Sequence, residues 1–383
     1  MPMPIQPPLR AKSSKVFPQA LKGRIEWNRF TSRVLEGNPW ADPVERDVPV
    51  YLPPSGETEG KPLLVLLSGY TGAGWMHFQR PRYLADSNIG RIDRLIRTGQ
   101  AAEAVVLAPD GLTSLGGSQY LNSSATGRYD DYVTRELVPW ARERYATGPV
   151  GVLGTSSGGY GAISLALRHP EVYRAAASDS GDMYFEYGYL PELPLAWRAI
   201  RRAGGPEALL EKLFSGPVDG FGPSSPLARG LEFMAYASCY SPVDSRPGTF
   251  ELPFDLETGA IRPDVWRRWL TFDPVRMIET PRYLRALHQL RYVYVDGGRD
   301  DEWNLEVSAR IFASVARSHG VKVDFEEFSG GHFDVGPRYE TMFPRLIRAL
   351  GFPAPRARTG PRRGPPTRRR SRPRTKRAPR STS

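Results

Sequence analysis

The chain has 383 residues and a formal net charge of +11, and 40% of its residues are hydrophobic. A chain of this length and composition can bury a large core, so we expect a globular protein. A single cysteine, Cys239, excludes an internal disulfide and a cysteine-based metal site. No apolar run reaches the roughly 18 residues of a membrane helix, and prolines interrupt the N-terminus where a signal peptide needs an apolar stretch. We therefore expect a cytoplasmic protein without membrane contact.

After a flexible segment over residues 1–22, short apolar runs alternate with helical patterns. The runs typical of strands lie at residues 63–67, 104–108, 150–154, 173–178, 292–295 and 322–328, and the clearest helical patterns at 130–145 and 159–170. This alternation predicts an α/β fold in which a mainly parallel central sheet carries helices on both faces. Residues 24–35 and 45–54 have no helical segment between them, so we expect antiparallel edge strands there.

One connection between predicted sheet strands is far longer than the usual 4 to 6 residues or so. We divide the chain into a first core part over residues 23–178, a lid or cap insertion over 179–290, and a second core part over 291–354. The insertion is rich in aromatic residues, which either line a lid over an apolar or aromatic ester or form the insertion's own small core. Asp182 and Glu186 at its start either contact a polar substrate group or form local hydrogen bonds.

The C-terminal segment over residues 355–383 contains twelve lysines and arginines and no acidic residue, so the rest of the chain is nearly neutral. Its Pro, Arg and Ser composition predicts disorder, because it has too little apolar surface to offset the entropy of ordering. The segment is either a solvated appendage or a weak, sequence-independent contact for polyanions such as nucleic acids.

The stretch GVLGTSSGGY contains Gly154-x-Ser156-x-Gly158 between a predicted strand and a predicted helix. This spacing is typical of a nucleophile elbow, a sharp turn whose central residue is strained and whose neighbours two positions away must be small. Centring the turn on Ser157 would put Thr155 at a position that needs a small residue. We therefore predict Ser156 as the nucleophile.

A serine nucleophile needs a histidine base and an acid, which follow it in chain order in this topology. Of the five histidines, only His332 lies in a glycine-flanked loop after the last predicted strand. The residues alone leave the acid open, and the candidates after the preceding strand are Asp296, Asp300 and Asp301, with Asp179 a more distant one.

The tetrahedral intermediate of ester cleavage needs two backbone N–H donors, one from the residue after the nucleophile and one from a loop after an early strand. Ser157 supplies the first by its position. Tyr70, in the stretch LLSGYTGAGW after the strand at 63–67, is our candidate for the second.

Several stretches together resemble one known family, among them LLSGYTG, GTSSGGYGAISLALRHPEVY, SDSGDMYFEY, DGGRDDEWNL and GGHFDVGPRY. The chain resembles the "putative esterase" family of α/β-hydrolases, which is related to enterochelin esterase, S-formylglutathione hydrolase and the antigen 85 mycolyltransferases. The resemblance covers roughly residues 23–352. It implies an α/β-hydrolase fold without metal or organic cofactor, and its acid motif D-x-G-x-x-D-E favours Asp301 over the alternative Asp300.

The resemblance and the residues together predict a serine esterase that cleaves a small-molecule carboxylic ester through an acyl-enzyme intermediate. The alternatives are an acyltransferase or a siderophore esterase on the same fold, and a catalytically silent binding module. Mycolyl transfer is disfavoured, because those relatives are exported and we expect no export here. The long insertion and the basic tail lie outside the shared core, so the substrate does not carry over from the family. The oligomeric state is left open.

Overall fold

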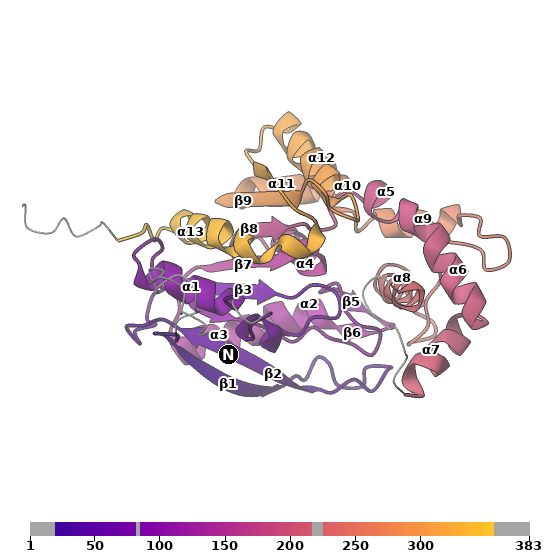
Figure 1. Ribbon diagram of the computed structural model, residues 1–383, viewed down its shortest axis with the longest axis horizontal. Helices are drawn as coiled ribbons and strands as arrows, with labels where there is room; N and C mark the ends of the chain where they lie inside the picture. The colour runs from indigo at the N-terminus through magenta and orange to yellow at the C-terminus, as the bar shows by residue number, and fades with distance from the viewer. Residues whose placement is uncertain (1–19, 82–84, 217–224, 356–383) are drawn as a thin grey trace, which may run out of the picture.

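The computed structural model describes residues 20–81, 85–216 and 225–355. Most of the predicted flexible N-terminal segment and the arginine-rich tail lie outside these ranges. Residues far apart in sequence form one central sheet flanked by helices, with a group of further helices to one side (Figure 1).

The central sheet has eight strands in the spatial order β1-β2-β4-β3-β7-β8-β9-β10. Strands β1 and β2 are antiparallel to each other, β2 is antiparallel to β4, and all the other pairs are parallel. The strand bounds are β1 Arg24–Thr31, β2 Glu45–Leu52, β3 Leu63–Leu67, β4 Val105–Leu107, β7 Val150–Thr155, β8 Tyr173–Asp179, β9 Tyr292–Gly298 and β10 Asp324–Phe328. Two short strands form a separate hairpin, β5 Asn122–Ser123 with β6 Gly127–Arg128. The mainly parallel sheet and its antiparallel edge are confirmed.

Helices cover both faces of the sheet because the side chains of each strand alternate between two cores. Leu63, Val65 and Leu67 of β3 belong to one apolar cluster, and Leu64 and Leu66 belong to the other. On the first face lie α2 Tyr129–Asp131, a π-helical turn Tyr132–Leu137, α3 Val138–Tyr145, α4 Ser157–Arg168 and α12 Leu305–Ser318; on the second lie α1 Asn88–Arg97 and α13 Tyr339–Ala349. Short 3-10 turns lie at η2 Gly74–Phe78, η5 His332–Asp334 and η6 Gly336–Arg338.

The segment between β8 and β9 is helical and builds a third apolar core. Its helices are α5 Phe185–Gly188, α6 Leu193–Ala203, α7 Pro206–Phe214, α8 Pro226–Tyr240, α9 Pro263–Leu270, α10 Pro274–Ile278 and α11 Pro281–Gln289, with a 3-10 turn η4 Leu190–Glu192. Tyr189, Phe233, Tyr240 and Trp269 pack together in this third core. Most of the aromatic residues therefore hold the insertion together, as one of the two sequence interpretations had it.

The last two helices of this segment pack differently. Val275, Met277 and Ile278 of α10 and Ala286 and Leu287 of α11 join the first sheet-face cluster. The third core is therefore made by the segment from α5 to α9 together with Leu115, Leu121 and Tyr160 of the first core part.

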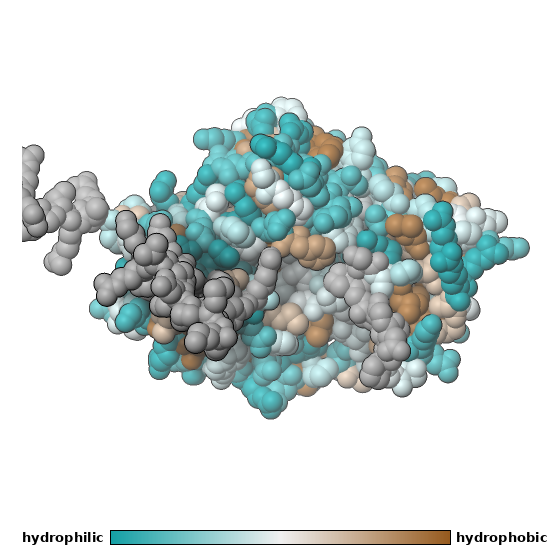
Figure 2. All heavy atoms as spheres, viewed as in Figure 1, coloured by the Kyte–Doolittle hydropathy of each residue, from teal (hydrophilic) through white to brown (hydrophobic). Residues whose placement is uncertain are grey.

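Large apolar side chains that stay exposed gather on the insertion. Figure 2 shows the hydrophobic surface concentrated on the side of the molecule where the insertion helices lie. Within the described residues, the exposed large apolar side chains of the insertion are Tyr187, Leu195, Phe214, Leu256 and Ile261. Across the described ranges, no helix is both long and apolar enough to cross a membrane.

Candidate active site

Ser156 lies at a sharp turn between β7 and α4, with φ 56° and ψ −128°. Backbone at positive φ is strained for a residue with a side chain. The flanking glycines are required by close packing: a Cβ on Gly154 would lie 2.4 Å from the Gly158 carbonyl oxygen, and a Cβ on Gly158 would lie 2.4 Å from the Leu67 carbonyl oxygen. The turn has the geometry that the glycine spacing predicted.

The neighbouring strands hold this turn in place. The Ser156 N–H donates to the Asp179 carbonyl at 2.9 Å, and the Ser156 carbonyl accepts from the Tyr160 N–H at 2.9 Å. Ser156 is the N-cap of the 12-residue helix α4, so the positive end of the helix dipole faces the serine. The turn and the helix thus present the hydroxyl in one orientation and in a field that favours negative charge.

His332 begins the short turn η5 after β10, and its ring is held by Asp301. The distance from His332 Nδ1 to Asp301 Oδ2 is 2.9 Å, and both side chains are buried. The other Asp301 oxygen accepts from the Trp303 N–H at 2.9 Å. A carboxylate on Nδ1 leaves Nε2 as the nitrogen that can accept a proton.

Asp300, the alternative acid, is exposed at the protein surface. Asp179 and Asp296 lie directly opposite each other at the ends of β8 and β9. Asp296 Oδ2 accepts from Tyr294 Oη and from Arg338 Nε, each at 2.7 Å. Burial, together with the charge of Asp296, raises the pKa of Asp179 well above its ordinary value. Of the sequence candidates for the acid, the structure puts only Asp301 in contact with His332.

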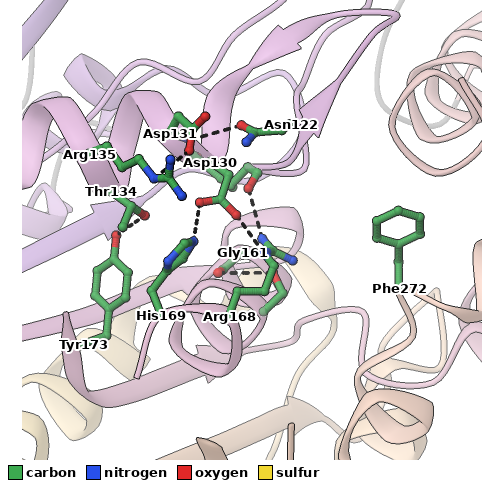
Figure 3. A network of polar contacts seen from close by, with 12 residues as sticks. Asn122, Asp130, Asp131, Thr134, Arg135, Gly161, Arg168, His169, Tyr173 and Phe272 are labelled. Atoms are coloured by element: carbon green, nitrogen blue, oxygen red, sulfur yellow. Dashed lines mark hydrogen bonds and ion pairs between the residues drawn. The ribbon is translucent and has the colours of Figure 1, made fainter. Parts of the chain in front are cut away.

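The other end of α4 carries a second histidine–aspartate contact, drawn in Figure 3. Asp130 Oδ1 lies 2.6 Å from His169 Nε2, and Asp130 Oδ2 accepts from Arg168 Nε at 2.7 Å. Burial alone would raise the pKa of Asp130, but the hydrogen bond from His169 and the charge of Arg168 outweigh it and lower that pKa. This network ties the C-terminal end of α4 to α2.

His77 has a different environment, buried beneath the loop that follows β3. Its Nε2 lies 3.0 Å from Ser68 Oγ and its Nδ1 lies 2.9 Å from Asn88 Nδ2. Burial lowers the pKa of His77 to about 4, so the ring is neutral at pH 7. The ring thus connects Ser68, the residue before Gly69, to the start of α1.

The two predicted oxyanion donors lie on rigid backbone beside Ser156. A Cβ on Gly69 would lie 3.2 Å from the Ser156 Cβ, which places the Tyr70 loop against the elbow. Tyr70 Oη donates to the Leu115 carbonyl at 2.9 Å, which fixes this loop from the other side. Within the described ranges, neither the Tyr70 N–H nor the Ser157 N–H has a hydrogen-bond acceptor.

A cavity of about 510 Å³ joins these groups. Ser156, His332 and Tyr70 line it, together with residues from the insertion and from the loops after β9 and β10. The lining residues beyond these three are Gly69, Thr71, Thr155, Asp182, Ala228, Glu232, Tyr236, Trp303, Leu305, Phe333 and Val335. In the part of the chain that the structure describes, no hydrogen bond joins Ser156 directly to His332. Catalytic hydrogen bonds are often long before substrate binds.

Two acidic residues of this site had no role in the sequence analysis: Glu302, which was named only as the last position of the D-x-G-x-x-D-E motif, and Glu232, which was not named. Glu302 Oε2 accepts from the His332 N–H at 2.8 Å and so fixes the loop that carries the histidine. Glu232 lines the cavity from α8. The four-residue spacing places Ala228, Glu232 and Tyr236 on one face of this helix, but the sequence carries no signal that this face meets the cavity. Of the two acids at the start of the insertion, Asp182 lines the cavity, whereas Glu186 pairs with Arg276 at 2.8 Å.

Comparison with known proteins identifies the family. Residues 43–350 match the family model described as "Putative esterase". The chain belongs to this esterase family of α/β-hydrolases. Across the described residues, no group of three or more His, Cys, Asp or Glu side chains is arranged to hold a metal ion.

Solved structures with the same fold include several esterases. A ferulic acid esterase is 19% identical with a TM-score of 0.55, covering 85% of this chain and 99% of that one. An S-formylglutathione hydrolase from Agrobacterium tumefaciens is 16% identical with a TM-score of 0.54, covering 87% and 98%. The feruloyl esterase module from Clostridium thermocellum is 12% identical with a TM-score of 0.51, covering 89% and 93%. At sequence identities this low, the similarity to these structures shows a shared fold and nothing about the substrate.

Proposed function

We propose that this esterase-family protein is a serine hydrolase that cleaves carboxylic esters, with Ser156 as nucleophile, His332 as general base and Asp301 as the acid that orients it. One observation carries the proposal. Ser156, on a strained strand-to-helix turn, lines the same cavity as His332, and His332 Nδ1 lies 2.9 Å from Asp301.

The chemistry follows from these positions. His332 Nε2 removes the Ser156 hydroxyl proton while Ser156 Oγ attacks the ester carbonyl carbon. The tetrahedral intermediate collapses, the bond to the alcohol oxygen breaks, and His332 returns its proton to the leaving alcohol. Water then attacks the acyl-enzyme in the same way, with His332 first as base and then as acid, and the carboxylic acid leaves. Asp301 holds the ring tautomer and stabilises the imidazolium in both halves.

The negative oxygen of each tetrahedral intermediate needs donors that are already in place. The Tyr70 and Ser157 N–H groups support this role, because they have no acceptor within the described residues and lie on either side of Ser156. The start of α4 adds the favourable end of its dipole at the same point. Removing one such donor in serine hydrolases costs about 3 kcal/mol of transition-state stabilisation.

The test uses p-nitrophenyl acetate and a fluorophosphonate probe on the purified protein. We expect hydrolysis by the wild type and a single labelled serine, located at Ser156 by peptide mass spectrometry. Ser156→Ala should lower kcat by about 10⁴-fold or more and abolish labelling.

Peptide mapping also separates Ser156 from its neighbour Ser157, because the two give different fragment ions. A label on Ser157, or full activity in Ser156→Ala, would contradict the proposal. Ser124→Ala, which removes an exposed hydroxyl bonded to Asp244, is the matched control and should keep full activity and labelling.

A further inference from the structure

The wall of the cavity at Ser156 includes two acidic side chains that the ester chemistry does not use. Asp182 follows β8 and lines the cavity, and Glu232 lines it from α8. Asp182 is only 5% exposed, and its Oδ2 has no hydrogen-bond partner among the described residues. A buried carboxylate oxygen without a donor is costly, so such a group in a cavity wall indicates a ligand that supplies the donor.

The charges around these two acidic side chains do not balance. Arg229 pairs with Glu232 at 2.6 Å, but it is also bound by a second carboxylate, Glu192, at 2.7 Å. The Arg229 guanidinium also lies over the Trp303 ring, with its Cζ 5.0 Å from the ring centroid. Within the described ranges, no lysine or arginine lines the cavity. One arginine between two glutamates leaves a surplus of negative charge, to which Asp182 adds.

The pKa of Asp182 is consistent with the lack of a positive charge beside it. Burial, followed by the charge of Glu232, raises the pKa of Asp182 to about 7. The nearby His332 and a hydrogen bond with Tyr189 lower that pKa, but not enough to offset the burial. A cation bound beside Asp182 would stabilise its charged form.

The remaining walls fit an alkyl or aryl chain that carries such a cation. Trp303, Leu305, Phe333 and Val335 are apolar, and Tyr236 presents an aromatic ring beside Glu232, to which its hydroxyl donates at 2.9 Å. A cavity lined by both carboxylates and aromatic rings is a favourable environment for an ammonium group, because the rings attract the cation as well.

We propose that the substrate is an ester bearing a primary ammonium group, bound at Asp182 and Glu232 in the wall of the cavity. This inference deepens the proposed esterase function and rests on it for the ester. The ammonium site itself does not depend on Ser156. Asp182 is therefore a specificity-determining residue, and its recognition step is a charge-assisted hydrogen bond in a site shielded from water.

The first experiment measures binding by isothermal titration calorimetry, with hexylammonium chloride and hexan-1-ol as probes. We expect hexylammonium to bind the wild type and Ser156→Ala about tenfold or more tightly than hexan-1-ol, since a hydrogen bond to a charged group is worth about 1.5–3 kcal/mol. Asp182→Asn, which keeps the shape and removes the charge, should abolish this preference. Asp47→Asn, which removes an exposed carboxylate on β2, is the matched control and should keep it.

The second experiment measures kcat/KM for p-nitrophenyl esters of ω-aminohexanoate, ω-hydroxyhexanoate and heptanoate. We expect the amino ester to be preferred about tenfold in the wild type and not in Asp182→Asn. Equal binding of hexylammonium and hexan-1-ol, or no binding of either, would overturn the inference whatever the esterase assays give. Ammonium binding without hydrolysis of any ester would uphold the ammonium site and overturn the proposed function.

Discussion

Two histidine–aspartate pairs lie near the two ends of helix α4, and they differ in what the second ring nitrogen meets. His332 is bound through Nδ1 to Asp301, and its ring lines the cavity beside Ser156. His169 is bound through Nε2 to Asp130, and its Nδ1 lies 3.4 Å from the Glu171 carboxylate. In the proposed function the first pair carries a proton, whereas the second pair is a structural contact. The two pairs differ in that the His332 ring lines the same cavity as Ser156, whereas the His169 ring lies between two carboxylates.

The aspartates differ in the same way. The second oxygen of Asp301 accepts a hydrogen bond from the backbone N–H of Trp303. This bond orients the Asp301 carboxylate without bringing an opposite charge next to it. The second oxygen of Asp130 accepts a hydrogen bond from the Arg168 guanidinium, so the negative charge of Asp130 is already compensated. An aspartate that stabilises an imidazolium must keep its charge available, and Asp130 does not.

The largest expected effect is on catalysis at the first pair. Asp301→Asn should lower kcat by about 10⁴-fold, because the amide favours the wrong ring tautomer. Steady-state kinetics with p-nitrophenyl acetate measure this loss. The matched variant Asp300→Asn removes the exposed neighbouring carboxylate and should change kcat less than about twofold. Equal losses in the two variants would refute the assignment of the acid.

A substitution in the second pair, His169 with Asp130, should lower the stability of the protein and leave kcat unchanged. Asp130→Asn leaves the partly buried Arg168 without its carboxylate, which should lower the free energy of unfolding by about 3 kcal/mol. Urea denaturation at pH 7 measures this difference, and kcat per folded molecule should stay at the wild-type value.

Glu171→Gln is the control, since it removes the exposed acid on the other side of His169 and should cost less than about 1 kcal/mol. The Asp130 contribution also has a defined pH dependence. Its folded pKa is lowered, so the stabilisation is present above the unfolded value of about 4 and is lost as the pH falls through the folded pKa. A wild-type advantage that persisted unchanged in strong acid would contradict the ion-pair explanation.

His77 is a buried histidine without an acidic partner among the described residues, and it provides a third case for the comparison. Its expected effect on stability is the smallest of the three. Its pKa of about 4 lies below the unfolded value of about 6.5, so the unfolded chain binds a proton first as the pH falls. Stability should be full above pH 6.5 and should decline by up to about 3 kcal/mol toward pH 4. Denaturation across this range should show a smaller decline in His77→Gln than in the wild type. His319→Gln, at an exposed histidine, should keep the wild-type decline.

The sequence allowed the sheet and the elbow to be predicted because their causes are local. Alternating apolar runs gave the strands, and the need for glycine at 154 and 158 comes from contacts within the turn itself. The acid could not be chosen from residues alone. Asp296, Asp300 and Asp301 fall within one short stretch, and only the path of the loop decides which of them faces His332.

The cavity wall was harder to foresee, because it depends on how the insertion sits on the core. Asp182 was identified as a candidate contact, but Glu232 was not, since α8 carries apolar residues on several sides and its periodicity does not say which side meets the sheet. The sequence left two interpretations of the insertion's aromatic residues, a lid or a core. Packing among Tyr189, Phe233 and Trp269 favours the core.

The positive φ of Ser156 has a consequence for how this chain can change under selection. A side chain held at φ 56° costs about 1–3 kcal/mol that the surrounding strands must outweigh. Glycine alone adopts such a backbone freely. Selection for thermal stability by itself would therefore favour glycine at position 156 and discard the hydroxyl. If Ser156 is the nucleophile as proposed, the hydroxyl at this position is kept at the expense of stability.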